Sequence, residues 1–178
     1  MVDGLLAVDA QGRHRYYRIA SAEVADALEG LATLAQSTSR RAMTDRELGT
    51  GLRFARSCYD HLAGRLAVRL RLALLERGLL VEDGLEHSVT AYGETVFLRF
   101  GLDLQKPRQE WRAFARACLD WSERRPHIAG SFGAGVLRRL LEQRWLLRCP
   151  GSRELEVTQE GWLGLVELLG VDPSALFE

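Results

Sequence analysis

The sequence lacks the features that mark secreted and membrane proteins. Only three cysteines occur in 178 residues, and no apolar stretch reaches the roughly 20 residues that a membrane span needs. The N-terminus also lacks the apolar region of a signal peptide. We therefore expect reduced thiols in a cytoplasmic protein that makes no contact with a membrane.

The sequence also has no excess of charge of either sign. The 24 Lys and Arg residues balance the 24 Asp and Glu residues, and 47% of the chain is hydrophobic. No overall positive field draws such a chain to nucleic acid, so any contact with DNA has to be local. The chain is long enough to bury a core without disulfides.

Most of the sequence after residue 52 is present twice. "FARSCYDHLAG" begins at Phe54, and "FARACLDWSERRPHIAG" begins at Phe114 with "WSERRP" inserted between its Asp and its His. The match continues through "LLERGLL" and "LLEQRWL" into two short predicted strands and a last helix. We interpret residues about 52–103 and 112–172 as two copies of one supersecondary unit.

Each copy is predicted to contain a helix that ends near its cysteine, a second helix, a hairpin around a Gly turn, and a third helix. The third helix begins at Thr90 in the first copy and at Thr158 in the second. This order matches the second half of a winged helix. The predicted fold class is therefore α+β and mostly helical, with two tandem winged-helix-like repeats.

The N-terminal part has a different pattern. Residues 3–20 predict a hairpin that turns at Gln11-Gly12, and residues 21–36 predict a helix with Leu28, Leu31 and Leu34 on one face. The polar residues 37–45 then predict a linker. The predicted domains are residues 1–40, a wing hairpin plus dimerisation helix, and residues 41–178, the duplicated effector domain.

These patterns together resemble a known family. "GRHRYYRIAS" and the Leu-striped helix resemble the wing and dimerisation helix of ArsR-like (arsenic-repressor-type) winged-helix transcription regulators, and the paired "CYDHLAG" and "CLDWSERRPHIAG" copies resemble the extension of a longer-tailed branch. The resemblance implies a homodimeric repressor that couples effector binding to DNA affinity. The family's recognition helix precedes the wing and has no counterpart here. DNA binding is therefore expected only in a full-length parent, and the family's metal motif transfers to no residue of this sequence.

The predicted hairpin tip carries the candidate DNA contacts Arg13, His14 and Arg15. Positive charge on a projecting element suits contact with phosphates. A solvated polar turn is the alternative.

Thiol, imidazole and carboxylate groups occur together in both copies, and they are the ligand types of a zinc-like or nickel-like site. The effector or metal candidates are Cys58, Asp60, His61, Cys118, Asp120 and His127. A spacing of three would place Cys58 and His61 on one face of a continuous helix, but the second copy has a spacing of nine. Three interpretations stay open: structural caps and packing residues, a small-molecule effector pocket, and a site for a transition-metal ion or for thiol redox sensing.

The "WSERRP" insertion adds Trp121, Arg124 and Arg125 to one copy only. An aromatic ring and two guanidinium groups suit an anionic ligand, so these residues are the candidate edge of an effector pocket, with a solvated surface loop as the alternative. A Cys/His-dependent enzyme is a third class, but neither cysteine follows a Gly-rich elbow, so no enzyme activity is expected. The predicted function is the sensing and dimerisation region of a winged-helix repressor, and the alternative is a structural oligomerisation module without a ligand.

Overall fold

The computed structural model describes residues 4–11, 14–20, 24, 51–110 and 112–169. Its contacts divide the chain into two compact units, Met1–Ala42 and Met43–Glu178. Among the described residues, no helix combines the length and the hydropathy that a membrane span requires.

The first unit contains the predicted hairpin. β1 (Leu6–Gln11) pairs antiparallel with β2 (His14–Ile19), so that Val8 lies opposite Tyr17 and Gln11 lies opposite His14. The hairpin prediction for residues 3–20 is therefore confirmed. The helix predicted over residues 21–36 and the linker predicted over residues 37–45 fall outside the described residues, apart from Val24, which is helical.

The second unit repeats one order of elements, a hairpin, a helix, a second hairpin and a second helix. In the first copy these are β3 (Arg56–Cys58), β4 (His61–Ala63), α3 (Arg65–Glu76), β5 (Leu80–Asp83), β6 (Glu86–Val89) and α4 (Ala91–Arg99). After the short α5 (Gln105–Arg108), the second copy contains β7 (Arg116–Leu119), β8 (Pro126–Ala129), α6 (Gly130–Glu142), β9 (Leu146–Arg148), β10 (Leu155–Val157) and α7 (Gln159–Leu169). The matching order supports a duplicated unit.

The prediction of a mostly helical fold is wrong, because the described residues form a mixed structure with antiparallel sheets. The error lies at the start of each copy, where a hairpin replaces the helix predicted to end near the cysteine. Ala and Arg in "FAR" favour a helix locally. Pairing with the other copy overrides that weak preference, since strand stability depends on neighbouring strands.

The first hairpin of each copy hydrogen-bonds to the second hairpin of the other copy. β6 and β7 pair within a four-stranded sheet of order β5-β6-β7-β8, and β3 meets the segment before β10 through the bridge between Arg56 and Glu154. Two equivalent backbone hydrogen bonds of 2.7–2.9 Å form at each junction: His87 N to Ala115 O, Ala117 N to Leu85 O, Leu155 N to Ala55 O, and Ser57 N to Arg153 O. Reciprocal contacts of this kind are typical of a two-fold arrangement.

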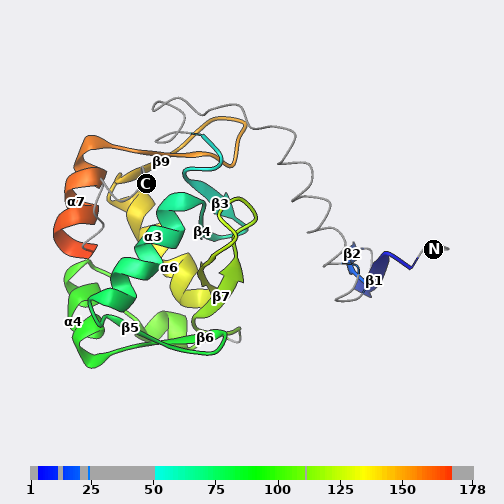
Figure 1. Cartoon of the computed structure of the whole chain (residues 1–178), viewed down its shortest axis with the longest axis horizontal. Coiled ribbons are helices and arrows are strands. Elements are labelled where there is room, and N and C mark those ends of the chain that lie inside the picture. The colour runs from blue at the N-terminus through cyan, green and yellow to red at the C-terminus, as the bar shows by residue number, and fades with distance from the viewer. Residues whose placement is uncertain (1–3, 12–13, 21–23, 25–50, 111, 170–178) are drawn as a thin grey trace. The chain divides into compact units, whose positions relative to one another are not determined.

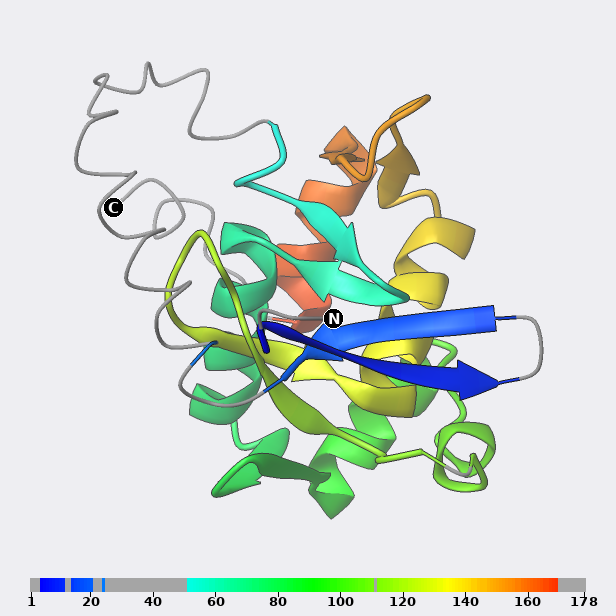
Figure 2. The ribbon, with the colours of Figure 1, turned by 90° about the vertical axis from the view of Figure 1, so that its right-hand side faces the viewer.

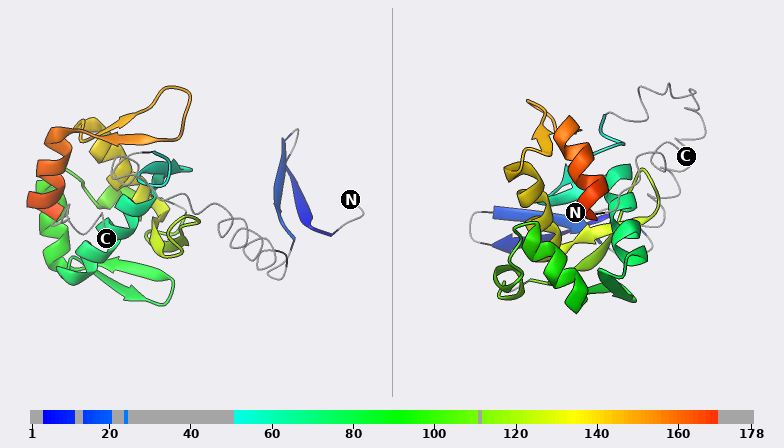
Figure 3. Two further views of the ribbon diagram at one scale, coloured as in Figure 1. Left: turned by 45° about the horizontal axis from the view of Figure 1, so that its top comes forward. Right: turned by 90° about the vertical axis from the view of Figure 1, so that its left-hand side faces the viewer.

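The core lies between the two copies. α3 and α6 cross at the centre, α3 packs on β8, and α6 packs on β4, while the β5–β6 and β9–β10 hairpins lie at opposite ends (Figures 1 and 3). The largest fully buried hydrophobic side chains are Leu66, Leu74, Leu79, Leu80, Phe97, Phe132, Leu137, Leu140, Leu146, Leu155 and Leu165. Each contributes roughly 1.5–3 kcal/mol by its burial. This packing fixes the two first hairpins relative to each other.

A glycine joins each first hairpin to the helix that follows. Gly64 and Gly130 have φ angles of 92° and 86°, in the left-handed region that favours glycine. A Cβ atom at Gly64 would lie 2.6 Å from the carbonyl oxygen of Phe54, and one at Gly130 would lie 2.6 Å from that of Phe114. The hairpins can therefore turn closely into α3 and α6 only with glycine at these positions.

Candidate metal centre

The cysteine and histidine of each copy are direct cross-strand partners. Cys58 of β3 lies opposite His61 of β4, and Cys118 of β7 lies opposite His127 of β8. The interpretation that Cys58 and His61 share a helix face is therefore wrong. Partners opposite each other on a sheet have their Cβ atoms about 4.5–5.5 Å apart, whatever the length of the connecting loop. The unequal spacings of three and nine thus produce equivalent pairs.

The fold brings the two pairs together, because β4 lies beside β8 (Figure 2). The four ligand atoms, which are two cysteine sulfurs and two imidazole nitrogens, all lie within 4.8 Å of one another. His61 and His127 are buried, whereas Cys58 and Cys118 are half-buried. Each copy therefore contributes one thiol and one imidazole to a single cluster.

Both imidazole rings have one nitrogen at a carboxylate and the other in the cluster. Nδ1 of His127 lies 3.2 Å from Oδ2 of Asp120, at ion-pair distance, and Nδ1 of His61 lies 3.4 Å from Oδ1 of Asp60. The two Nε2 atoms are 3.2 Å apart. If both Nδ1 atoms carry the proton, the two Nε2 lone pairs face each other, and a cation bound between them removes their repulsion.

The distances fit a tetrahedral ion. Zinc–nitrogen bonds of 2.0–2.1 Å place two imidazole nitrogens about 3.3 Å apart, and zinc–sulfur bonds of about 2.3 Å place two thiolates about 3.8 Å apart. The Nε2–Nε2 distance of 3.2 Å agrees with the first value. The widest pair in the cluster, at up to 4.8 Å, has to close by roughly 1.0–1.3 Å, depending on whether it is a sulfur–sulfur or a sulfur–nitrogen pair.

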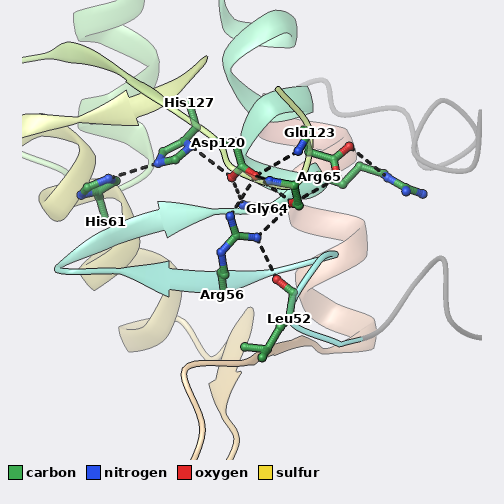
Figure 4. Close-up of polar contacts among 9 residues, drawn as sticks. Leu52, Arg56, His61, Gly64, Arg65, Asp120, Glu123 and His127 are labelled. Atoms are coloured by element: carbon green, nitrogen blue, oxygen red, sulfur yellow. Dashed lines mark hydrogen bonds and ion pairs between the residues drawn. The ribbon is translucent and has the colours of Figure 1, made fainter. Parts of the chain in front are cut away.

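Asp120 connects His127, the histidine of the second copy, to residues of the first copy. Its Oδ2 accepts a 2.6 Å hydrogen bond from the Gly64 backbone, and its Oδ1 accepts a 2.8 Å bond from Arg56 (Figure 4). The side chain and backbone of Ser122 donate to the same Oδ1. Burial alone would raise the pKa of Asp120, but the adjacent His127 ring and the hydrogen bonds from Arg56, Gly64 and Ser122 hold it well below its ordinary value. Asp120 is therefore an ionised carboxylate held on both sides.

Asp60, the equivalent carboxylate of the first copy, has a more open environment. Its side chain is 48% exposed and pairs with Arg112 as well as with His61. Burial is the largest single influence and raises the pKa of Asp60, but Arg112 and His61 together outweigh it and lower the pKa below the ordinary value. The His61 half of the cluster is thus held less firmly than the His127 half.

One imidazole and one thiol of the cluster, those of His61 and Cys118, have shifted pKa values. Burial lowers the pKa of His61, and the neighbouring His127 lowers it further, so that the ring is neutral near pH 7, as a metal ligand must be. Burial and the adjacent Cys58 raise the pKa of Cys118 to about 11. A bound metal ion deprotonates a coordinating thiol, so binding at this cluster would release protons.

The inserted loop covers the ion pair beside the cluster. Residues 120–125 connect β7 to β8, and the half-exposed ring of Trp121 lies 4.5 Å from the Arg56 guanidinium carbon. Arg124 and Arg125 are exposed, and the Arg125 carbonyl accepts a hydrogen bond from Asp120 N. Their role as a pocket edge stays a prediction.

The candidate DNA contacts belong to the first unit. His14 and Arg15 are the first residues of β2, and Arg13 falls outside the described residues. The sequence interpretation missed Arg56, Gly64 and Ser122. Arg56 and Gly64 were visible as matched repeat positions, but only the fold shows that they bind Asp120.

Comparisons with known proteins place the chain in a family. No protein-family model and no solved structure matches it. The uncharacterized HTH-type transcriptional regulator YdfF of Bacillus subtilis (strain 168) is 40% identical over 167 residues, which cover 94% of this chain and 74% of that protein. With this identity along nearly its whole length, the chain belongs to the HTH-type transcriptional regulators.

Proposed function

We propose that this chain is the sensing region of an ArsR-like winged-helix repressor, in which Cys58, His61, Cys118 and His127 bind one transition-metal ion. Zinc is the expected ion. A tetrahedral set of two thiolates and two imidazoles suits zinc, whereas magnesium and calcium prefer oxygen ligands.

The observation that carries the proposal is the convergence of four ligand atoms within 4.8 Å, from two hairpins that are far apart in the sequence. The carboxylates of Asp60 and Asp120 at the outer ring nitrogens support it. Metal-binding histidines usually donate their second N–H to such a group, which orients the ring. If the two histidines were only structural caps, which is the alternative interpretation, both rings would not need to face the same point.

An ion at this cluster would link the two copies. Two of its ligands belong to the β3–β4 hairpin and two belong to the β7–β8 hairpin. Occupancy would therefore favour one relative position of the hairpins. Each first hairpin also pairs with the other copy's second hairpin, which offers a physical route from the cluster to the rest of the unit. A ligand changes DNA affinity only to the extent that it binds the two conformations differently.

The remaining parts of the proposal concern DNA and assembly. The β1–β2 hairpin would act as the wing, with Arg13, His14 and Arg15 at DNA phosphates in the full-length regulator. Residues 21–36 would supply the helix of a homodimer. The family membership supports DNA binding by the whole protein.

Metal content tests the site directly. The protein is purified without a chelator, and its zinc is measured by mass spectrometry and by competition with a chromophoric chelator. We expect an equimolar amount of zinc in the unsubstituted protein and in Cys149→Ser, a control outside the cluster, and a large loss in Cys58→Ser and Cys118→Ser. Equal zinc in all four proteins would rule out this site.

A measurement of DNA affinity distinguishes an ion that is sensed from one that is purely structural. The affinity of the full-length regulator for its own promoter is measured with zinc and after chelation, with circular dichroism to confirm that the protein stays folded. We expect a difference of roughly 5–150-fold. An unchanged affinity in folded, zinc-free protein would favour a purely structural ion.

A further inference from the structure

Two cysteines from different copies are near neighbours in this unit. Cys58 and Cys118 belong to β3 and β7, and their sulfur atoms lie within 4.8 Å of each other. Neither residue is fully buried, so a small reagent in solvent can approach them. No turn of the chain forces this proximity, because it results from packing between the two hairpins.

We propose that Cys58 and Cys118 are also a redox pair, which a hydroperoxide converts into a disulfide that removes both thiolate ligands from the metal site. The link to metal release depends on the function proposed above, whereas disulfide formation itself does not. The sulfurs have to approach from within 4.8 Å to the bonding distance of about 2.05 Å.

The chemistry needs a peroxide and no other reactant. One thiolate sulfur attacks a peroxide oxygen, the O–O bond breaks, and an alcohol leaves, or water in the case of hydrogen peroxide. The second thiol attacks the resulting sulfenic acid, the S–S bond forms, the S–O bond breaks, and water leaves. Each sulfur loses one electron, and the peroxide gains both.

The position of Cys149 makes the pair selective. Cys149 follows β9, and its backbone N–H donates to Glu154 across the turn into β10. It is not part of the cluster formed by Cys58, His61, Cys118 and His127. Within the cluster, a sulfenic acid at Cys58 therefore has only the Cys118 thiol to condense with, and one at Cys118 has only the Cys58 thiol.

Oxidation would leave only His61 and His127 as donors at the cluster. Structural zinc sites in proteins almost always have four ligands, so two imidazoles hold the ion much more weakly. The disulfide would also fix the two hairpins covalently, in place of the ion. Metal occupancy and oxidation are then mutually exclusive states of the same residues.

The test uses the zinc-loaded chain and its Cys149→Ser variant. Zinc content is measured first, and hydrogen peroxide is then added in molar excess. Free thiols, released zinc and disulfide-linked peptides are followed over time. We expect one of the three thiols of the unsubstituted chain to remain, zinc to be released in step with thiol loss, and a Cys58–Cys118 peptide that dithiothreitol cleaves. Cys149→Ser should form the same peptide.

Two outcomes would overturn the proposal. One is a chain that contains zinc and forms no Cys58–Cys118 disulfide, and the other is a disulfide that involves Cys149. Peptide mapping of chelator-treated protein distinguishes the metal site from the redox pair, because it detects the disulfide in protein without zinc. A disulfide in a protein that never bound zinc would overturn the metal site and keep the redox pair.

Discussion

Arg56 of the first copy and Asp120 of the second form a buried ion pair, with Nη2 2.8 Å from Oδ1 and exposed side-chain fractions of 1% and 0%. The guanidinium also donates to the Leu52 carbonyl at 2.8 Å and to the Ser122 hydroxyl at 3.2 Å. Asp120 reaches His127 through its other oxygen. One carboxylate thus connects the packing between the copies to the orientation of a candidate metal ligand.

Asp120→Asn should destabilise the fold strongly. The substitution removes the partner of a buried positive charge, and such losses cost about 3–5 kcal/mol. Zinc affinity should fall by roughly 10–100-fold as well, because His127 loses its orienting carboxylate. Urea denaturation and zinc competition measure the two effects.

Asp60→Asn is the matched control for Asp120→Asn. It changes the equivalent carboxylate of the first copy, which is 48% exposed. Exposed ion pairs contribute about 0.2–1 kcal/mol, so the loss of stability should stay within that range. Equal destabilisation by the two substitutions would contradict the role assigned to the buried pair.

Gly64→Ala should unfold the junction between β4 and α3. The added Cβ atom would lie 2.6 Å from the Phe54 carbonyl oxygen, and the backbone that has to move donates to Asp120. We expect a cost well above the roughly 1–2 kcal/mol of a left-handed backbone alone. Gly84→Ala provides the comparison, because Gly84 has a φ of 59° and open space around it. Similar melting temperatures for the two variants would contradict the steric argument.

The stability of the protein should depend on His87 at mildly acidic pH. His87 is buried, and its Nε2 lies 3.0 Å from Nε of Arg71, which donates to it. Burial and the Arg71 charge lower the pKa of His87, and the charges of Glu82 and Glu86 oppose them only in part. The unfolded chain therefore takes up a proton first as the pH falls below about 6.5, and stability is lost in that range.

His87→Gln isolates this effect, because glutamine does not titrate. The difference in unfolding free energy between the two proteins should change as the pH falls from about 7.5 to about 5, with a slope of at most about 1.4 kcal/mol per pH unit. Chemical denaturation at several pH values measures it. Parallel curves for the two proteins would show that His87 titrates alike in both states.

Zinc should stabilise the fold only when the cluster is intact. At a concentration of about 100 times its Kd, a ligand that binds only the folded state adds about 2.7 kcal/mol. Thermal unfolding should show this gain in the unsubstituted chain and in Cys149→Ser. A gain of the same size in Cys58→Ser would place the ion elsewhere.

The repeat was readable from the sequence, because the residues from Phe54 to Asp60 recur at a constant offset from Phe114 to Asp120, and the later matches are shifted only by insertions. The helix and hairpin that follow Gly64 and Gly130 were also predicted, since a Leu-rich stripe and a Gly turn are local signals. The hairpins at Cys58 and Cys118 were not. Their strands depend on partners in the other copy, and no local pattern carries that information.

The residue types of the candidate site were determined by the sequence alone: a thiol, an imidazole and a carboxylate in each of two copies. Only the tertiary structure decided that Cys58 pairs with His61, that Cys118 pairs with His127, and that all four residues meet at one point. The physical reason is that strand pairing and the packing of β4 beside β8 act between segments far apart in the chain, whereas spacing along the sequence reports only on neighbours.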